Sequence, residues 1–176
     1  MRYYQDDHIL IRPMSTTDPT YFAAEERKQG WHSTPAKLER RLRDERDGLC
    51  LTFVAEYGGL PAGYVSLYLH PTTGAFANQS IPEIVDFAVL ETFRRHGIGG
   101  RLMDTAERAA SKWCDRVYLG VGLHSGYGSA QRMYVKRGYI PDGSGVWYND
   151  RVCDPYAPCA NDDDLVLYLI KDLTKE

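Results

Sequence analysis

The sequence predicts an α/β protein in which helices pack against a mixed sheet, and three observations support this. Residues 84–90 are apolar on both faces, as in a strand that is covered on both sides. Beyond a glycine-rich turn, apolar residues recur at helical spacing from Ile98 to Trp113. Residues 49–56 and 60–69 are rich in β-forming residues and flank Tyr57-Gly58-Gly59, which predicts a hairpin.

Length and composition indicate an ordinary globular protein, and we expect one domain over residues 1–176. Hydrophobic residues make up 43% and charged residues 26% of the chain, and the net charge of -3 argues against a general nucleic-acid binder. No apolar run approaches the roughly 18 residues of a membrane span, and the polar N-terminal stretch lacks the apolar core of a signal peptide. The chain is therefore predicted to be cytoplasmic, without a membrane or nucleic-acid partner.

The cysteines and histidines show no spacing typical of a metal site. The four cysteines are scattered, and we expect reduced, structural thiols: Cys50, Cys114, Cys153 and Cys159. The five histidines form no H-E-x-x-H or similar pair. We therefore predict no metal.

The N-terminal part is expected to form a strand and then a helix. Residues 8–13 form a short strand closed by proline. Asp18 is the expected N-cap, with Pro19 at the first helical position. The helix should run to about Gln29, with Gly30 as its stop.

A second helix should follow, opened by Ser33 or Thr34 with Pro35 next, and ended by Gly48. It contains the charged run 39–47. We interpret that run as a solvated face, because this is the commoner use of such runs.

The C-terminal half alternates strands and helices. The expected elements are a strand at 116–123, a helix at 130–137 with Ser129 as N-cap and Gly138 as stop, a short strand at 146–148, and a final strand at 165–170. Residues 149–164 resist regular structure, and a segment of this kind is usually functional or disordered.

The glycine-rich turn before residue 98 suits an anion. The first N–H groups of a helix have no partner within it, and the helix dipole adds partial positive charge there. Glycines allow the backbone to approach a phosphate closely. The turn combines three glycines with four basic side chains: Gly97, Gly99, Gly100, Arg94, Arg95, His96 and Arg101.

The glycine spacing fits neither the dinucleotide pattern G-x-G-x-x-G nor the nucleotide loop G-x-x-x-x-G-K-[ST]. It reads R-x-x-G-x-G-G from Arg94, preceded by residues 86–93. This closely resembles the acetyl-CoA pyrophosphate motif of the GNAT N-acetyltransferase superfamily. Farther along, residues 129–139 are similar to the second motif of that family, with matches at Ala130, Met133, Tyr134, Gly138 and Tyr139. The resemblance covers most of the chain and is weakest over residues 149–164.

The resemblance implies a single-domain, mixed and mostly antiparallel sheet that is splayed at the cofactor site and carries helices on both faces. It also implies acetyl-CoA as co-substrate, with pantetheine along the strand that ends at 87–89 and pyrophosphate on the amides of 95–101. The implied cofactor-binding residues are Phe87, Ala88, Val89, Arg94, Arg95, His96, Gly97, Ile98, Gly99, Gly100 and Arg101.

The resemblance also implies the catalytic residues. Tyr134, at the tyrosine position of the family, would protonate the departing CoA sulfur, although a tyrosine on such a helix face can be a core residue. Glu83 matches the position of a glutamate that serves some members as a base, and Asp86 is the competing carboxylate. Either one can instead be a strand-end charge facing solvent. Tyr127 stands where many relatives carry an asparagine that contacts pantetheine, so that contact is not expected here.

The predicted function is transfer of the acetyl group of acetyl-CoA to a primary amine by direct attack in a ternary complex. The alternative is a non-catalytic acyl-CoA-binding regulatory module. The fold does not identify the amine acceptor. The oligomeric state is open, with a homodimer as one candidate. The role of residues 149–164 is also open, since their acidic side chains can attract a cationic amine or simply be solvated.

Overall fold

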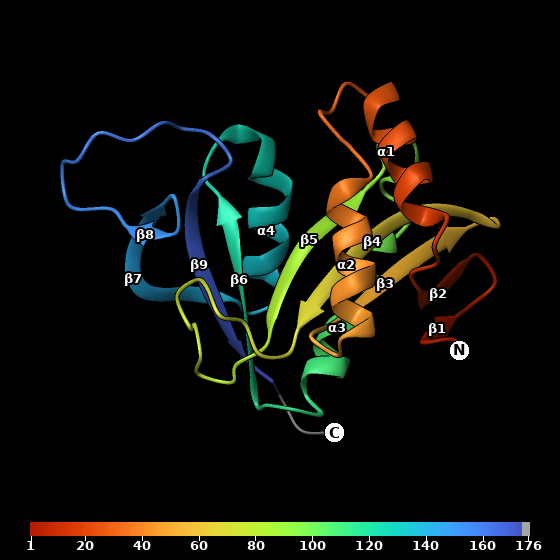
Figure 1. The fold of residues 1–176 in the computed structure, drawn as a ribbon, viewed down its shortest axis with the longest axis horizontal. Helices are drawn as coiled ribbons and strands as arrows, with labels where there is room; N and C mark the ends of the chain where they lie inside the picture. Colours follow the sequence, from red (N-terminus) through yellow and green to blue (C-terminus); the bar gives the residue numbers. More distant parts are fainter. Residues whose placement is uncertain (174–176) are drawn as a thin grey trace. The chain divides into compact units, whose positions relative to one another are not determined.

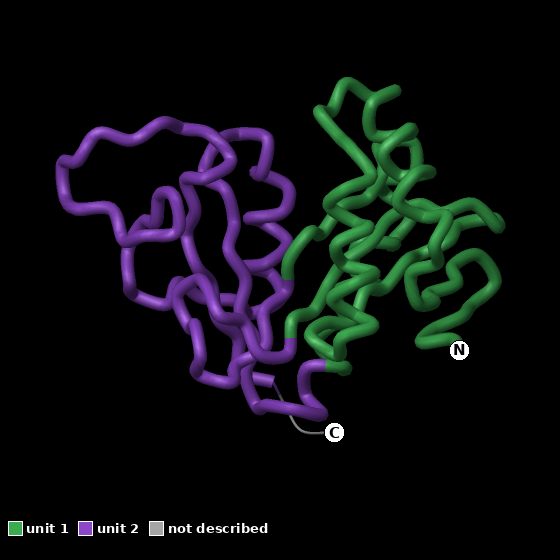
Figure 2. The backbone as a smooth tube through the Cα atoms, viewed as in Figure 1, with its two compact units in different colours: residues 1–68, 85–109 green, residues 69–84, 110–176 purple. Residues whose placement is uncertain are grey.

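The computed structural model describes residues 1–173, which fall into two compact units (Figure 2). Unit 1 contains Met1–Tyr68 and Val85–Ala109, and unit 2 contains Leu69–Ile84 and the chain from Ala110 onward. Strand β5, Glu83–Val89, begins in unit 2 and continues in unit 1. The interpretation of residues 1–176 as one domain stays a prediction.

Unit 1 consists of strands with helices on both faces (Figure 1). Its hydrogen-bonded strands follow the order β1-β2-β3-β4-β5, with β1 to β4 antiparallel. The elements are β1 (Tyr4–Gln5), β2 (Ile9–Pro13), α1 (Asp18–Lys28), α2 (Ala36–Arg46), β3 (Cys50–Tyr57), β4 (Leu60–Tyr68), most of β5, the 3-10 turn η1 (Glu91–Phe93) and α3 (Ile98–Ala110).

Alternate residues of β5 serve the two faces of unit 1. Ala88 packs against a buried cluster that α1, α2 and the strands share: Met14, Phe22, Leu38, Val54, Tyr64 and Leu90. Phe87 and Val89 approach Gly99 of α3 instead. Because successive side chains of a strand point to opposite faces, α3 lies on the face opposite α1 and α2. This confirms the expected helices on both faces.

Unit 2 holds the second half of the sheet. The start of β5 is parallel to β6, with Glu83 opposite Tyr118 and Ile84 opposite Leu119, and the order continues β6-β9-β7-β8 with antiparallel pairs. The elements are β6 (Arg116–Gly122), η2 (Ser125–Tyr127), α4 (Gly128–Lys136), β7 (Ile140–Tyr148), β8 (Arg151–Val152) and β9 (Leu165–Asp172). The predicted mixed, mostly antiparallel sheet is confirmed.

The helix starts differ from the predictions because the expected capping side chains have other partners. The N-cap of α1 is Thr17, and Asp18 is already helical. The Asp18 carboxylate accepts hydrogen bonds from the Ser15 N–H (2.6 Å) and from both terminal nitrogens of Arg12 (2.7 and 2.9 Å). The N-cap of α2 is Pro35, whereas the Ser33 hydroxyl donates to Glu26.

Other boundaries are also shifted. Helix α4 has Tyr127 rather than Ser129 as its N-cap. Helix α3 ends at Ala110, so that Trp113 lies outside it with 59% of its surface exposed. The short strand expected at 146–148 is the end of the longer β7, whose pairing with β9 is interrupted between Pro141 and Val146.

Asp18 provides a test of the packing of α1. Burial alone would raise the pKa of Asp18, but the hydrogen bonds from Arg12 and Ser15 hold it below its ordinary value of 3.8. A lowered pKa stabilises the fold fully above pH 3.8, and this contribution is lost as the pH falls through the folded-state value. We expect Asp18→Asn to lower the free energy of unfolding by about 2 kcal/mol at pH 7, because the Arg12 guanidinium loses one of its two charged partners and keeps only Glu56.

Urea denaturation of the wild type and of Asp18→Asn at several pH values checks this expectation. The difference between the two proteins should shrink on the acid side of pH 3.8, where the native carboxylate begins to be protonated. A difference that stays constant down to the lowest measurable pH would contradict it.

Candidate active site

The loop between β5 and α3 exposes backbone amides at the start of a helix. Arg95 and Gly97 both have left-handed backbones, with φ of 65° and 79°. The Arg101 N–H donates to the Gly97 carbonyl at 3.1 Å, which closes the first turn of α3. Amides that precede this bond belong to the set that a helix leaves without an internal partner. They are suited to bind an anion.

The two adjacent glycines of the first turn have different roles. A Cβ at Gly99 would lie 3.1 Å from Phe87 Cζ and 3.7 Å from Val89 Cγ2, so the absence of a side chain lets α3 pack closely on β5. A Cβ at Gly100 would meet no atom within 4 Å. Gly99 therefore serves the strand–helix packing, and Gly100 faces open space.

Two arginines of the loop are engaged by protein groups. Arg94 lies 3.4 Å from a Glu91 carboxylate oxygen and 5.8 Å from the ring centre of Trp31. The guanidinium of Arg101 lies 4.7 Å from the ring centre of Tyr4. Because these charges are partly occupied, the backbone amides are the more available anion ligands.

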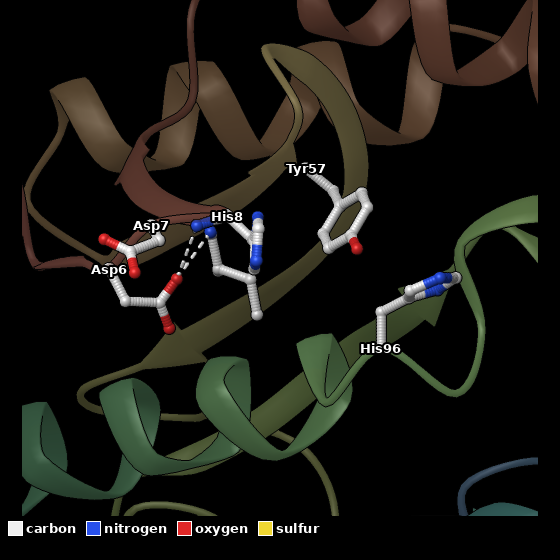
Figure 3. Close-up of a pocket in the computed structure, with 6 residues that line it drawn as sticks. Asp6, Asp7, His8, Tyr57 and His96 are labelled. Carbon is white, nitrogen blue, oxygen red and sulfur yellow. Dashed lines mark hydrogen bonds between the residues drawn. The ribbon is translucent and has the colours of Figure 1, made fainter.

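The side chain of His96 lies beside Tyr57, at the end of β3. Its Nδ1 lies 3.2 Å from the Phe93 carbonyl oxygen, and its ring centre is 4.6 Å from that of Tyr57. It borders a cavity of about 340 Å³ within unit 1 (Figure 3), whose lining residues are Asp6, Asp7, His8, Ile9, Tyr57 and His96. The imidazole of His96 thus borders this cavity and is exposed.

Tyr134, the predicted acid, is a buried residue of α4 in unit 2. Its exposed fraction is 6%, and its ring centre is 5.9 Å from that of Tyr139. Burial, and secondarily Tyr127, raise the pKa of Tyr134 above its ordinary value. The phenol therefore keeps its proton throughout the neutral range, as a proton donor must.

The two candidate bases have different surroundings. Glu83 stands opposite Tyr118 at the start of β5. Burial and then the charge and hydrogen bond of Glu83 raise the pKa of Tyr118. Asp86 has a left-handed φ of 54°, and its Oδ2 accepts a hydrogen bond from Arg41 Nε at 2.5 Å. Asp86 is thus already committed to a cation, whereas Glu83 faces a phenol.

The side chain of Tyr127 contacts the segment 149–164 through Asp163. Its hydroxyl donates to Asp163 Oδ1 at 2.8 Å, and His124 Nε2 lies 2.9 Å from the same oxygen. His124 Nδ1 accepts from the Gly126 N–H, so Nε2 carries the proton and donates to Asp163. Burial and the bond to Asp163 raise the pKa of Tyr127 to about 12. The segment 149–164 was expected to lack regular structure, but it contains β8, and through Asp163 it is attached to the turn before α4.

The predicted site residues fall into two groups. All the predicted cofactor-binding residues, Phe87 to Val89 and Arg94 to Arg101, lie in unit 1, and the predicted catalytic residues Tyr134 and Glu83 lie in unit 2. Sequence reasoning missed Arg41 and Asp163. The only signals for them were a charged helix and an acidic loop, both of which are usually solvated.

Comparisons with known proteins identify the family. Residues 12–139 match the model of the Acetyltransferase (GNAT) family, so the chain belongs to this family. It is thus an acetyl-CoA-dependent N-acetyltransferase, and the family assignment gives no support to a non-catalytic acyl-CoA-binding module. No curated protein sequence matches the chain.

Solved structures share the fold at low sequence identity. Ard1 from Thermoplasma volcanium has 21% identity and a TM-score of 0.69, with 95% of this chain and 99% of that chain covered. An acetyltransferase from Salmonella typhimurium that modifies the N-terminal serine of ribosomal protein L7/L12 has 8% identity and a TM-score of 0.72, with 99% and 100% covered. The yncA protein of Salmonella typhimurium with its cofactor acetyl-CoA has 13% identity and a TM-score of 0.67, with 97% and 96% covered.

The loop fits the phosphate end of acetyl-CoA, which is the co-substrate of this family. The outward amides of α3 and the open space at Gly100 leave room for a bulky anion. Within residues 1–173, no three His, Cys, Asp or Glu side chains gather as metal ligands would. No helix in the same part of the chain has the length and apolar character to cross a membrane.

The glycine pair predicts how the loop binds CoA. Gly99→Val should weaken CoA binding by about tenfold or more, because the added methyl groups push α3 away from Phe87 and Val89. Gly100→Val is the matched comparison: its Cβ meets no protein atom within 4 Å, so it should leave thermal stability nearly unchanged, whereas its side chain enters the space proposed for the anion and should weaken CoA binding. Calorimetric titration with CoA, combined with thermal unfolding of each variant, measures both effects.

The same titration separates backbone from side-chain binding. Arg95→Asn keeps a residue that tolerates φ of 65°, so it removes the charge without adding strain. We expect a loss of about threefold, typical of one exposed charge near a phosphate. A loss equal to that of Gly99→Val would show that side-chain charge holds the ligand.

Proposed function

We propose that this N-acetyltransferase acts on the primary amine of a protein, with Tyr134 as proton donor to the CoA sulfur and Glu83 as the base. The observation that carries the assignment to acetyl-CoA chemistry is the match of residues 12–139 to the Acetyltransferase (GNAT) family. The acceptor class is supported by the acetyltransferase of similar fold that modifies the N-terminal serine of a ribosomal protein. Cytoplasmic location and a homodimer remain predictions.

Most of the rate would come from holding the two reactants together. Orientation in a ternary complex can supply about 7–11 kcal/mol of the barrier. Acetyl-CoA brings an activated thioester, so the chain's own residues need only bind, orient and move protons. The first turn of α3 and residues 87–89 would bind and orient the co-substrate, as the family resemblance implies.

Tyr134 is suited to hold a proton until it is needed. Its phenol is buried, and burial raises its pKa, so the proton stays on the oxygen at neutral pH. The raised pKa also makes the phenol a weaker acid, so proton transfer requires that the hydroxyl contact the sulfur while the thiolate develops.

Glu83 is suited to receive a cationic amine. Its charge, and those of Asp150 and Asp142, act together with burial to raise the pKa of Tyr168. Three carboxylates in range of one phenol make this part of unit 2 attractive to an ammonium group. A carboxylate there can take the proton that the ammonium must lose before it attacks.

An acceptor screen tests the proposal. Peptides with different N-terminal residues, free amino acids, polyamines and aminoglycosides are each incubated with the chain and acetyl-CoA, and thiol release is recorded. Peptide amines should give the highest kcat/KM. Release that is highest with a small amine would overturn the protein acceptor, and CoA binding without release for any amine would favour a regulatory module.

Tyr134→Phe tests the acid. The substitution keeps the ring contact with Tyr139 and removes only the hydroxyl, so CoA affinity should change little. We expect kcat to fall roughly 10- to 1000-fold, the range of a lost proton donor. Single-turnover kinetics with a slow acceptor check that chemistry limits the rate, and an unchanged rate under those conditions would remove Tyr134 from the mechanism.

Glu83→Gln tests the base. CoA binding should be kept, and kcat at pH 7 should fall by about 100-fold, the size expected for a lost general base. Raising the pH should recover part of the rate, because a larger share of the amine is then already neutral. A pH–rate profile from 6 to 10 measures this recovery, and a profile parallel to that of the wild type would argue that solvent deprotonates the amine.

A further inference from the structure

Asp86 has a backbone conformation that is unusual inside a strand. Its φ is 54°, within the left-handed region, although it lies in the middle of β5. Such a conformation costs a residue other than glycine about 1–2 kcal/mol, and aspartate and asparagine are the side chains that tolerate it best. Conformations of this kind persist only where the surroundings enforce them.

The side chain of Asp86 is held from α2. Arg41 Nε donates to Asp86 Oδ2 at 2.5 Å, and both side chains are only 16% exposed, so this is not a mobile surface pair. Arg41 itself is fixed on β4, where a terminal nitrogen donates to the Tyr68 hydroxyl at 2.6 Å and the guanidinium stacks 5.0 Å from the ring centre. The Tyr68 hydroxyl in turn donates to Asp44 of α2.

Asp86 lies just beyond the part of β5 that is in register with β6. The register with β6 covers Glu83 and Ile84, and thus ends before Asp86. Beyond Asp86, the strand runs along β4, with the Leu90 N–H donating to the Ala62 carbonyl at 2.9 Å. Side chains alternate between faces along a strand, so the backbone at Asp86 decides which face each following residue serves.

The following residues are those for which cofactor contact is proposed. Phe87 and Val89 pack toward Gly99, and Ala88 packs toward the cluster beneath α1 and α2. If Asp86 relaxed to an ordinary strand φ, the strand would have to turn, and both contacts would be disturbed. The backbone conformation of Asp86 thus determines which way the side chains of Phe87, Ala88 and Val89 point.

We propose that Arg41 and Asp86 are positioning residues of the transferase, whose ion pair holds the left-handed backbone of β5 and so presents Phe87–Val89 to the co-substrate. This inference rests on the proposed contact between acetyl-CoA and residues 87–89. It gives Asp86 a conformational role instead of the catalytic role that the sequence also allowed. To act as a base, Asp86 would have to use its second oxygen or break the bond to Arg41.

Four substitutions of Asp86 separate these roles. Glycine adopts positive φ freely, and asparagine tolerates it while its amide oxygen can still accept from Arg41. Asp86→Gly and Asp86→Asn should therefore keep KM for acetyl-CoA and kcat within about threefold of the wild type. Asp86→Ala should raise that KM by about fivefold or more, and Asp86→Val by more still, because β-branched residues are outliers at positive φ.

Arg41 is tested by a double-mutant cycle. Arg41→Met should raise KM for acetyl-CoA by about fivefold in the wild-type background. This is the effect expected when a strained backbone conformation loses the contact that stabilises it. In the Asp86→Gly background, it should change KM by less than about twofold, because glycine needs no side chain to hold it. Asp18→Asn serves as a matched control, since it breaks a buried ion pair of unit 1 away from β5 and should lower stability without changing KM.

The outcomes are distinct. Loss of activity in Asp86→Asn and Asp86→Gly as complete as in Asp86→Ala would overturn the proposal and support a chemical role for the carboxylate. Equal thermal destabilisation in all variants with an unchanged KM would also overturn it, since the pair would then only tie α2 to the sheet. Failure of the wild type to bind acetyl-CoA would instead refute the proposed cofactor site, and CoA titration of the wild type reveals this first.

Discussion

The site depends on the close contact between the first turn of α3 and β5. A Cβ at Gly99 would lie only 3.1 Å from Phe87 Cζ. The side chain of Phe87 therefore packs directly against the backbone of α3. This contact sets the direction of the helix start and hence of its free amides. The arginines near the loop add positive charge. However, Arg94 already contacts Glu91 and Trp31, and Arg101 contacts Tyr4. Geometry would therefore be the primary determinant of the proposed anion binding, and charge would be secondary.

The face of unit 1 that α1 and α2 cover is unusually polar for an interior. This is possible because its polar groups form hydrogen bonds with one another. Tyr64 donates to the buried Glu26 at 2.6 Å and accepts from Lys37 at 3.1 Å. Arg41 joins Asp86 and Tyr68 in the same layer. Buried polar groups that are paired cost little, but an unpaired one is expensive. Loss of one partner from this layer is therefore costly, and this makes it suited to hold a strained residue in place.

The sequence alone predicted the order of the elements, the hairpin, the glycine loop and the family, because these depend on local pattern. It did not predict the hydrogen bonds and ion pairs that side chains form between elements. Asp18 and Ser33 were expected as caps, yet both serve long-range partners. The charged run of α2 was interpreted as solvated, yet Arg41 is buried against β4 and β5. The spacing of residues on a helix predicts which side chains share a face. Whether such a side chain has an ion-pair or hydrogen-bond partner on a neighbouring element depends on tertiary packing.

Strand β5 connects the two halves of the proposed chemistry. Its first residues, Glu83 and Ile84, belong to unit 2, and the rest belong to unit 1 with the loop and α3. The proposed base thus lies on the same strand as the proposed cofactor contacts, three residues before Asp86 and four before Phe87. Because acetyl transfer draws most of its rate from proximity, the conformation of this short stretch matters for the reaction. A strained residue there lowers stability, and in our proposal the ion pair with Arg41 holds it in the conformation that presents Phe87–Val89.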